Sequence, residues 1–200
     1  MRRGRLWLFL VFLLLAGLSG IWRYRQWREH RFDAVILEAS RRYRVDPALV
    51  KAVIWRESWF NPKARGKAGE FGLMQIRAGA AREWAVAERI RAFAPDQLLD
   101  ARTNALAGAW YLGRLLSRYQ PADNPLPYAL ADYNAGRSHV LHWKNGKAAT
   151  NSAAFVEGID FPGTRRYVRA VLRRYEQYRP VFPEPVEQQA GKGENEKGRR

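Results

Sequence analysis

The chain has 200 residues, of which 47% are hydrophobic and 13% aromatic, enough to bury one sizeable core, so wholesale disorder is excluded. It contains no cysteine, which excludes disulfides, thiolate metal ligands, a cysteine nucleophile and a lipidated N-terminal cysteine. The net charge of +16 suits a polyanionic partner (nucleic acid, anionic lipid or an acidic wall polymer), but charge alone does not choose among them.

The N-terminal segment is predicted to be an export signal or a single membrane anchor. Leu6 to Trp22 carries no charge and follows three arginines, and its length is near the short limit for spanning a bilayer. Cleavage after Gly20 matches the small-x-small rule poorly. An uncleaved anchor formed by residues 1–31 is therefore favoured over a cleaved signal. Four arginines also follow the segment and weaken the orientation argument: Arg23, Arg25, Arg28 and Arg31.

The remaining chain divides into a folded part and a tail. Residues 183–200 have almost no apolar side chains and are predicted to be disordered. No repeat or linker interrupts residues 32–182, so we expect a single domain there.

That domain is predicted to be all-α, with at most a small β element near residues 68–76. Asp46-Pro47 is a helix start, and this helix should run to Ser58, before Asn61-Pro62. Asp100 should cap a central core helix that reaches Tyr119. Further helices are expected at about 126–134, 137–144 and 164–179.

One carboxylate falls on the apolar face of the helix that starts at Asp46. On a helical wheel, Glu57 lies in the arc of Leu49, Val50, Val53 and Ile54, with Lys51 and Trp55 on the other side. Desolvation and the negative end of the helix dipole should both raise its pKa, as a general acid requires. The alternative is an ion pair with Arg56 or another arginine.

Several motifs occur together in one order. They are Glu57-Ser58-Trp59-Phe60-Asn61-Pro62-Lys63-Ala64, Gly72-Leu73-Met74-Gln75 and Tyr133-Asn134-Ala135-Gly136, followed by Thr164-Arg165-Arg166-Tyr167. In this order and spacing the chain resembles the lytic transglycosylases, the lysozyme-like muramidases related to goose-type lysozyme. The resemblance covers roughly residues 35–178 and implies a lysozyme-like domain.

The resemblance implies a reaction with one acid/base. Glu57 would protonate the glycosidic oxygen between N-acetylmuramic acid and N-acetylglucosamine, and the muramyl N-acetyl group would assist at C1. Glu57 would then take the proton of the C6 hydroxyl, leaving a 1,6-anhydro end. Substrate assistance replaces the second carboxylate that most glycosidases need.

Other motif positions are candidate substrate-binding residues. Gln75 offers an amide suited to N-acetyl groups, Met74 an apolar wall, and Gly72 a close approach of backbone to sugar or simply a turn. By resemblance Tyr133 lies near the catalytic carboxyl, and Asn134 contacts substrate or closes its helix. The set is completed by Ser58, which we expect to support Glu57 or the helix end, by Tyr167 beside the groove, and by Glu70.

Three positions depart from the family pattern. Gly66 stands where many members have a substrate-contacting serine, and Glu70 where a small residue is common, which leaves a hydrolytic route open. Arg77 replaces a methionine and could alter contact with the glycan or its acidic peptide stems.

The expected partners are glycan strands of peptidoglycan and the inner membrane through residues 6–22, with the catalytic domain in the periplasm, or secretion if the signal is cleaved. No cofactor, metal or nucleic acid is expected, since the three histidines lack clustered acids and no nucleic-acid motif is present. The alternatives are a lysozyme-type hydrolase using Glu70 or Asp132 as a second carboxylate, a wall-binding protein without catalysis, and a membrane-tethered nucleic-acid binder.

Overall fold

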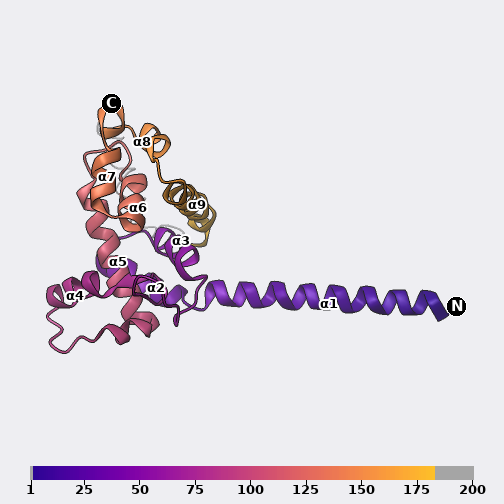
Figure 1. Ribbon diagram of the computed structural model, residues 1–200. Helices are drawn as coiled ribbons and strands as arrows, with labels where there is room; N and C mark the ends of the chain where they lie inside the picture. Colours follow the sequence, from indigo (N-terminus) through magenta and orange to yellow (C-terminus); the bar gives the residue numbers. More distant parts are fainter. Residues whose placement is uncertain (1, 183–200) are drawn as a thin grey trace, which may run out of the picture. The chain divides into compact units, whose positions relative to one another are not determined.

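The computed structural model describes residues 2–182 (Figure 1). In these residues the regular secondary structure consists of helices and one two-stranded hairpin, joined by loops, as the sequence predicts. The predicted tail over 183–200 lies outside the described residues.

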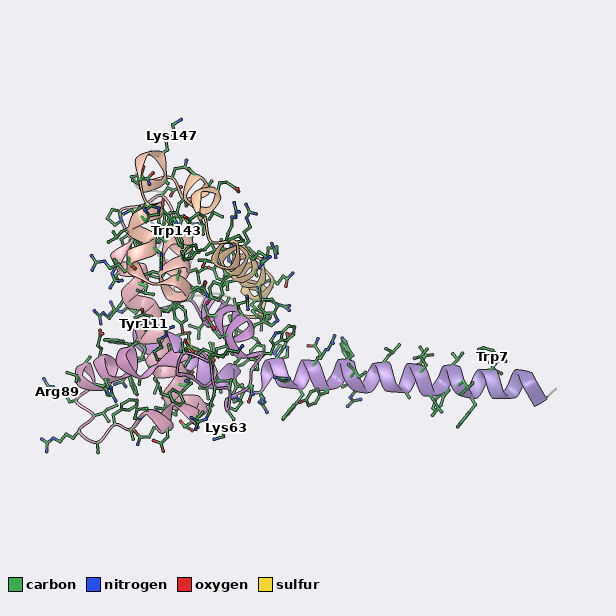
Figure 2. All side chains as sticks on the ribbon, in the orientation of Figure 1. Trp7, Lys63, Arg89, Tyr111, Trp143 and Lys147 are labelled. Carbon is green, nitrogen blue, oxygen red and sulfur yellow. The ribbon has the colours of Figure 1, made fainter. Side chains whose placement is uncertain are left out.

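The first helix, α1 (Arg2–His30), continues beyond the apolar segment into the arginine-rich residues. The described large apolar side chains from Trp7 to Trp22 are all about half exposed or more, and Figure 2 shows side chains such as Trp7 projecting from α1. Among the described residues, this is the helix whose length and composition suit a membrane crossing.

The packing divides the chain into two compact units, each described here by itself. Among the described residues, the first comprises 2–44 and 54–111, and the second comprises 45–53 and 112–182. Two helices contribute to both units, α3 (Pro47–Ser58) and α5 (Ala101–Arg118).

The start of α3 follows from its capping residue. The Asp46 carboxylate accepts the backbone N–H of Ala48 at 2.8 Å, and Pro47 takes the first helical position, where no N–H is needed. The helix ends at Ser58, and the next two residues, Trp59 and Phe60, adopt left-handed backbone angles (φ 51° and 60°). Both predicted ends of this helix are confirmed.

The rest of the first unit surrounds a small hairpin. Strands β1 (Glu70–Phe71) and β2 (Ile76–Arg77) pair antiparallel, with Glu70 opposite Arg77. The helices are α2 (Asp33–Tyr43), α4 (Ala78–Ala87), the 3₁₀ helix η1 (Pro95–Leu99) and the first part of α5. Asp100 caps α5 by accepting the Thr103 N–H at 2.8 Å, as predicted.

The second unit is built on α6 (Pro125–Ala135) and α9 (Pro162–Tyr178), which pack against each other. Between them the chain forms α7 (Arg137–Trp143), the 3₁₀ helix η2 (Gly146–Ala149) and α8 (Ser152–Gly158), and η3 (Arg179–Val181) follows α9. In its core the Tyr128 ring stacks on Phe155 with centroids 4.1 Å apart. The three helices predicted here are present within about two residues.

One prediction about α3 is incomplete. Lys51 was placed opposite the apolar arc, yet its side chain is fully buried. Its ammonium lies 5.1 Å from the centre of the Tyr178 ring and 5.3 Å from that of Phe182. These cation–π contacts come from the end of the described chain and cover the second face of the helix.

Candidate active site

Glu57 lies in the last turn of α3 and is half-buried. The residues of its predicted apolar arc, Leu49, Val50, Val53 and Ile54, are at most 1% exposed. The predicted arc is therefore buried, but so is every other residue of α3 from Ala48 to Ile54, and the helix becomes partly exposed only in the last turn, where Glu57 lies. The proposed high pKa of this carboxyl stays a prediction.

The neighbouring Ser58 fixes the end of α3 to the hairpin. Its hydroxyl donates to the backbone carbonyl of Leu73 at 2.7 Å, with the Ile54 carbonyl 3.2 Å away. The hydroxyl thus joins the helix that carries Glu57 to the turn between β1 and β2.

Asn104, from α5, holds that turn from the other side. Its side-chain oxygen accepts the Met74 N–H at 2.7 Å, and its amide donates to the carbonyls of Phe71 (2.7 Å) and Leu98 (2.9 Å). Asn104 is fully buried, and water does not compete for its bonds to Met74 and Leu98, whereas the bond to the Phe71 carbonyl is partly buried. Asn104 is not among the predicted site residues, yet its hydrogen bonds connect the start of α5 to the hairpin turn and to η1.

The same contacts explain Gly72, at φ +75°. A Cβ here would lie 2.3 Å from the Asn104 amide nitrogen and 2.3 Å from the Leu98 carbonyl oxygen. Close approach to protein atoms and a left-handed backbone therefore both require glycine. Met74, two residues later, is fully buried against Gly108 and supports the turn from within the unit.

Gln75 and Glu70 converge on Gly66. A Cβ at Gly66 would lie 2.2 Å from the Glu70 Oε2 atom and 2.9 Å from the Gln75 Oε1 atom, so the two side chains use the space that any larger residue would need. The Gln75 amide donates to the Gly72 carbonyl at 3.0 Å, which leaves its oxygen directed toward Gly66.

The Glu70 carboxylate is held in place by Arg77 and by the chain itself. Arg77 Nε donates to Oε1 at 3.0 Å, and the Ala68 N–H donates to Oε2 at 3.0 Å. Burial of the carboxyl opposes ionisation, but the hydrogen bonds from Arg77 and the backbone outweigh it and lower the pKa of Glu70. Glu70 is therefore an anion at neutral pH.

The remaining predicted residues belong to the second unit. Tyr133 is half-buried and Asn134 is exposed, both near the end of α6. The Asn134 side-chain oxygen accepts the Thr164 hydroxyl at 2.9 Å, which connects α6 to the start of α9. Tyr167, on α9, is only 2% exposed.

Asp132 precedes Tyr133 and is only 2% exposed. Its carboxylate accepts hydrogen bonds from Arg118 Nη1 (2.7 Å) and from the Tyr119 hydroxyl (2.8 Å). The pair with Arg118 crosses from α5 to α6 within the second unit and anchors the helix that carries Tyr133. Sequence reasoning did not identify Arg118 as the partner, since nothing in its spacing distinguishes it from the other arginines.

The part of the chain that the structure describes contains no cluster of three or more His, Asp or Glu side chains able to hold a metal ion. Within the first unit, the predicted residues offer a carboxyl group at a helix end, and an amide and a second, ion-paired carboxylate on one hairpin.

Comparison with known proteins gives this arrangement a family. The sequence matches the Transglycosylase SLT domain over residues 34–156, a range that includes every predicted site residue except Tyr167. It is 35% identical over 160 residues to the soluble lytic murein transglycosylase of Escherichia coli (strain K12), covering 77% of this chain and 24% of that protein. It is 36% identical over 113 residues to membrane-bound lytic murein transglycosylase F of Desulfosudis oleivorans, covering 55% of this chain and 23% of the relative.

Solved structures agree. The 70 kDa soluble lytic transglycosylase of Escherichia coli superposes with a TM-score of 0.68 at 31% identity, covering 76% of this chain and 24% of the other. An inactive mutant of the lytic transglycosylase Slt of Pseudomonas aeruginosa gives a TM-score of 0.67 at 29% identity, with 78% and 25% covered. The chain spans about a quarter of the length of these relatives. The match over residues 34–156 and the shared fold place this chain in the SLT transglycosylase family.

Proposed function

We propose that this chain is a membrane-anchored lytic transglycosylase that cleaves the β-1,4 bond between N-acetylmuramic acid and N-acetylglucosamine in peptidoglycan. The observation that carries the proposal is the place of Glu57. It lies half-buried in the last turn of a helix whose residues 48–54 are all buried, and its neighbour Ser58 ties this helix end to the turn that contains Gln75. The relatives named as lytic murein transglycosylases support the reaction class.

In the proposed mechanism Glu57 acts twice. It first donates its proton to the glycosidic oxygen while the substrate's own N-acetyl group stabilises the developing charge at C1. The carboxylate then accepts the proton of the C6 hydroxyl, whose oxygen bonds to C1. Glu57 regains its proton, water is not consumed, and the product is a 1,6-anhydromuramyl end.

The carboxylates that a hydrolase could use as a second group have other tasks. Asp132 is buried and accepts hydrogen bonds from Arg118 and Tyr119, so it lacks the freedom to orient a water molecule. Glu70 is bound by Arg77 and by the Ala68 N–H. A route through one carboxylate fits this arrangement better than hydrolysis with two.

The membrane anchor is the second part of the proposal. Helix α1 presents its apolar side chains outward over residues 7–22, as a helix in lipid does and a helix in a soluble core does not. A transglycosylase must reach its substrate, so the proposal places the folded units in the periplasm, where the peptidoglycan lies.

The function is tested by digesting purified sacculi with the full chain in detergent and weighing the released muropeptides by mass spectrometry. We expect anhydro products, each lighter by one water than its hydrolysed counterpart. Glu57→Gln keeps the size of the side chain but removes the transferable proton, and should lower the rate by about 10³-fold or more, because one group performs both proton transfers. Glu83→Gln, an exposed position on α4, is the matched control and should keep the full rate.

Each failure has a distinct meaning. Products with reducing ends instead of anhydro ends would show that the protein is a hydrolase and not a transglycosylase. Full lysis by the Glu57→Gln variant would show that another residue is the acid. Binding to sacculi without any lysis by the unchanged chain would favour a wall-binding protein without catalysis.

A further inference from the structure

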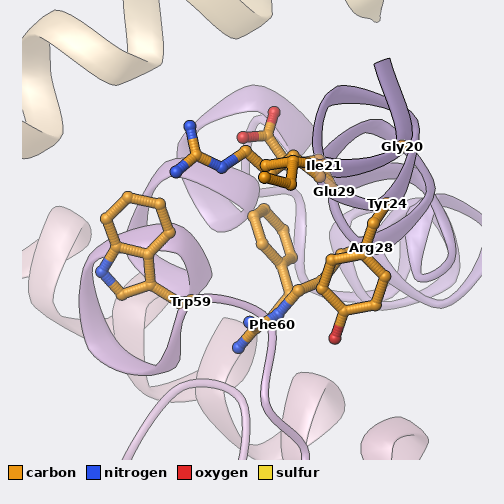
Figure 3. A pocket seen from close by; sticks show the side chains of 8 residues that line it. Gly20, Ile21, Tyr24, Arg28, Glu29, Trp59 and Phe60 are labelled. Atoms are coloured by element: carbon orange, nitrogen blue, oxygen red, sulfur yellow. The ribbon is translucent and has the colours of Figure 1, made fainter. Parts of the chain in front are cut away.

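A cavity lies where α1 meets the turn that follows α3. It has a volume of about 430 Å³ and is lined by Trp59 and Phe60 from the turn and by a set of residues from α1: Gly20, Ile21, Tyr24, Arg25, Arg28 and Glu29. Figure 3 shows Trp59 on one side of the cavity and side chains of α1 on the other. All of these residues belong to the first unit.

The wall formed by the turn is held firmly. The Arg31 guanidinium donates to the Phe60 carbonyl at 2.8 Å and lies over the rings of Trp27 (4.9 Å) and Phe32 (4.5 Å). Trp59 has a left-handed backbone (φ 51°), which is strained for a bulky residue and costs on the order of 1 kcal/mol. Despite this cost, its side chain remains 56% exposed instead of entering the core.

The lining changes character along α1. Gly20 and Ile21 stand at the end of the uncharged segment, whereas Arg25 and Arg28 lie one to two turns further on. At about 1.5 Å per residue, Arg25 is about 6 Å beyond Ile21, within the roughly 5–8 Å thickness of a lipid headgroup layer. Tyr24, between them, suits the boundary between hydrocarbon and headgroups.

From this gradient we propose that the cavity binds one anionic phospholipid of the membrane. Its upper acyl chain and glycerol would lie against Ile21, Tyr24 and the Trp59 indole, and its phosphate would meet Arg25 and Arg28. Glu29 reduces the positive charge of the lining to one net unit, which suits a single phosphate. The proposal rests on the proposed membrane anchor but not on the catalytic role of Glu57.

A lipid in this cavity touches the chain two residues after Glu57. Trp59 follows Ser58 directly, so the lipid would support the same turn that ends the catalytic helix. The bilayer would then hold the turn at Trp59 and Phe60 in place, in addition to anchoring the unit through α1.

The test is native mass spectrometry of the full chain in detergent, titrated with phosphatidylglycerol or with phosphatidylcholine. We expect one retained phosphatidylglycerol per chain and markedly weaker retention of phosphatidylcholine. The double variant Arg25→Gln/Arg28→Gln should bind phosphatidylglycerol at least about 10-fold more weakly than the unchanged chain, since two charge-assisted contacts are lost. The control Arg23→Gln/Arg41→Gln removes the same charge from exposed positions outside the lining and should stay within about twofold of the unchanged chain, because general charge attraction alone is weak.

Further arms separate the alternatives. Trp59→Ala should weaken retention and Trp22→Ala, an exposed tryptophan on α1 outside the lining, should not. Soluble glycerol phosphate should not displace the lipid; full displacement would mean a free-phosphate site and would overturn the lipid assignment. Equal retention of both lipids, or equal behaviour of the two arginine variants, would also overturn it.

Catalysis is measured on the same samples. Glu57→Gln should retain phosphatidylglycerol, and Arg25→Gln/Arg28→Gln should still lyse sacculi in detergent. Failure of lipid binding thus leaves the enzymatic proposal standing, and absence of lysis leaves the lipid site standing.

Discussion

Replacing Asn104 by alanine should destabilise the first unit strongly. The substitution leaves the Met74 N–H and the Leu98 carbonyl without their partner in a buried place, and the Phe71 carbonyl without its partner in a partly buried one. At about 1.5 kcal/mol for each orphaned group, less a few tenths regained from the higher helix propensity of alanine, the free energy of unfolding should fall by about 4 kcal/mol. For a chain of this length that corresponds to a drop in melting temperature of about 8–16 °C.

The assay is thermal unfolding of the detergent-solubilised full chain, followed by circular dichroism. Asn104→Asp is a second variant of nearly equal size: its carboxylate can still accept the Met74 N–H but faces the two carbonyl oxygens without a donor, so it should also lose several kcal/mol. Asn145→Ala, at an exposed position with one hydrogen bond to the His142 carbonyl, is the control and should change stability by about 0.5 kcal/mol or less. A melting temperature for Asn104→Ala within about 2 °C of the unchanged chain would refute the idea that this side chain holds the turn.

Two further predictions concern carboxylates of the first unit. Gly66→Ala should lower the free energy of unfolding by about 1–3 kcal/mol, because its Cβ displaces the Glu70 carboxylate from Arg77. In a double-mutant cycle of melting temperatures, adding Glu70→Ala should recover part of this loss. If the loss is the same with and without Glu70→Ala, Glu70 is not the obstacle. Glu88 accepts hydrogen bonds from Arg42 and Tyr43, which lower its pKa below the ordinary 4.5 although burial opposes this. The stability that this ion pair contributes is present above pH 4.5 and is lost as the pH falls through the lowered pKa of Glu88. Glu88→Gln should therefore be less stable than the unchanged chain at pH 7, and the difference should shrink when unfolding is measured at acid pH. A constant difference at every pH would contradict the ion pair.

Local signals predicted much of the helical structure. Asp46-Pro47 and Asp100 fixed helix starts, because a capping carboxylate needs only its own backbone neighbours. Helices α2 and α4 begin at residues without a side-chain cap, after Phe32 and Arg77, and were not among the predicted segments. Helix α8 was also missed, although Asn151 caps it by accepting the Ala154 N–H.

The site was predictable where it depends on one helix and not where distant segments meet. The stripe that leads to Glu57 follows from the helical period alone. The partners of Asn104, and the filling of the space beside Gly66 by Glu70, depend on long-range packing of α5 and on the hairpin's fold, which no single-sequence pattern encodes. The burial of Lys51 likewise needs Tyr178 and Phe182, more than a hundred residues away.

The junction between α1 and α2 has a mechanical consequence for the proposed anchor. Only Arg31 and Phe32 separate the two helices, and Arg31 is itself fastened to the Phe60 carbonyl. A connection of two residues, one of them hydrogen-bonded to the folded part, leaves the proposed catalytic unit little freedom to move away from the membrane toward distant layers of the wall. Glycan strands would have to pass close to the bilayer to be cleaved. Inserting a flexible spacer at this junction would increase the distance from the bilayer at which one molecule can cleave them.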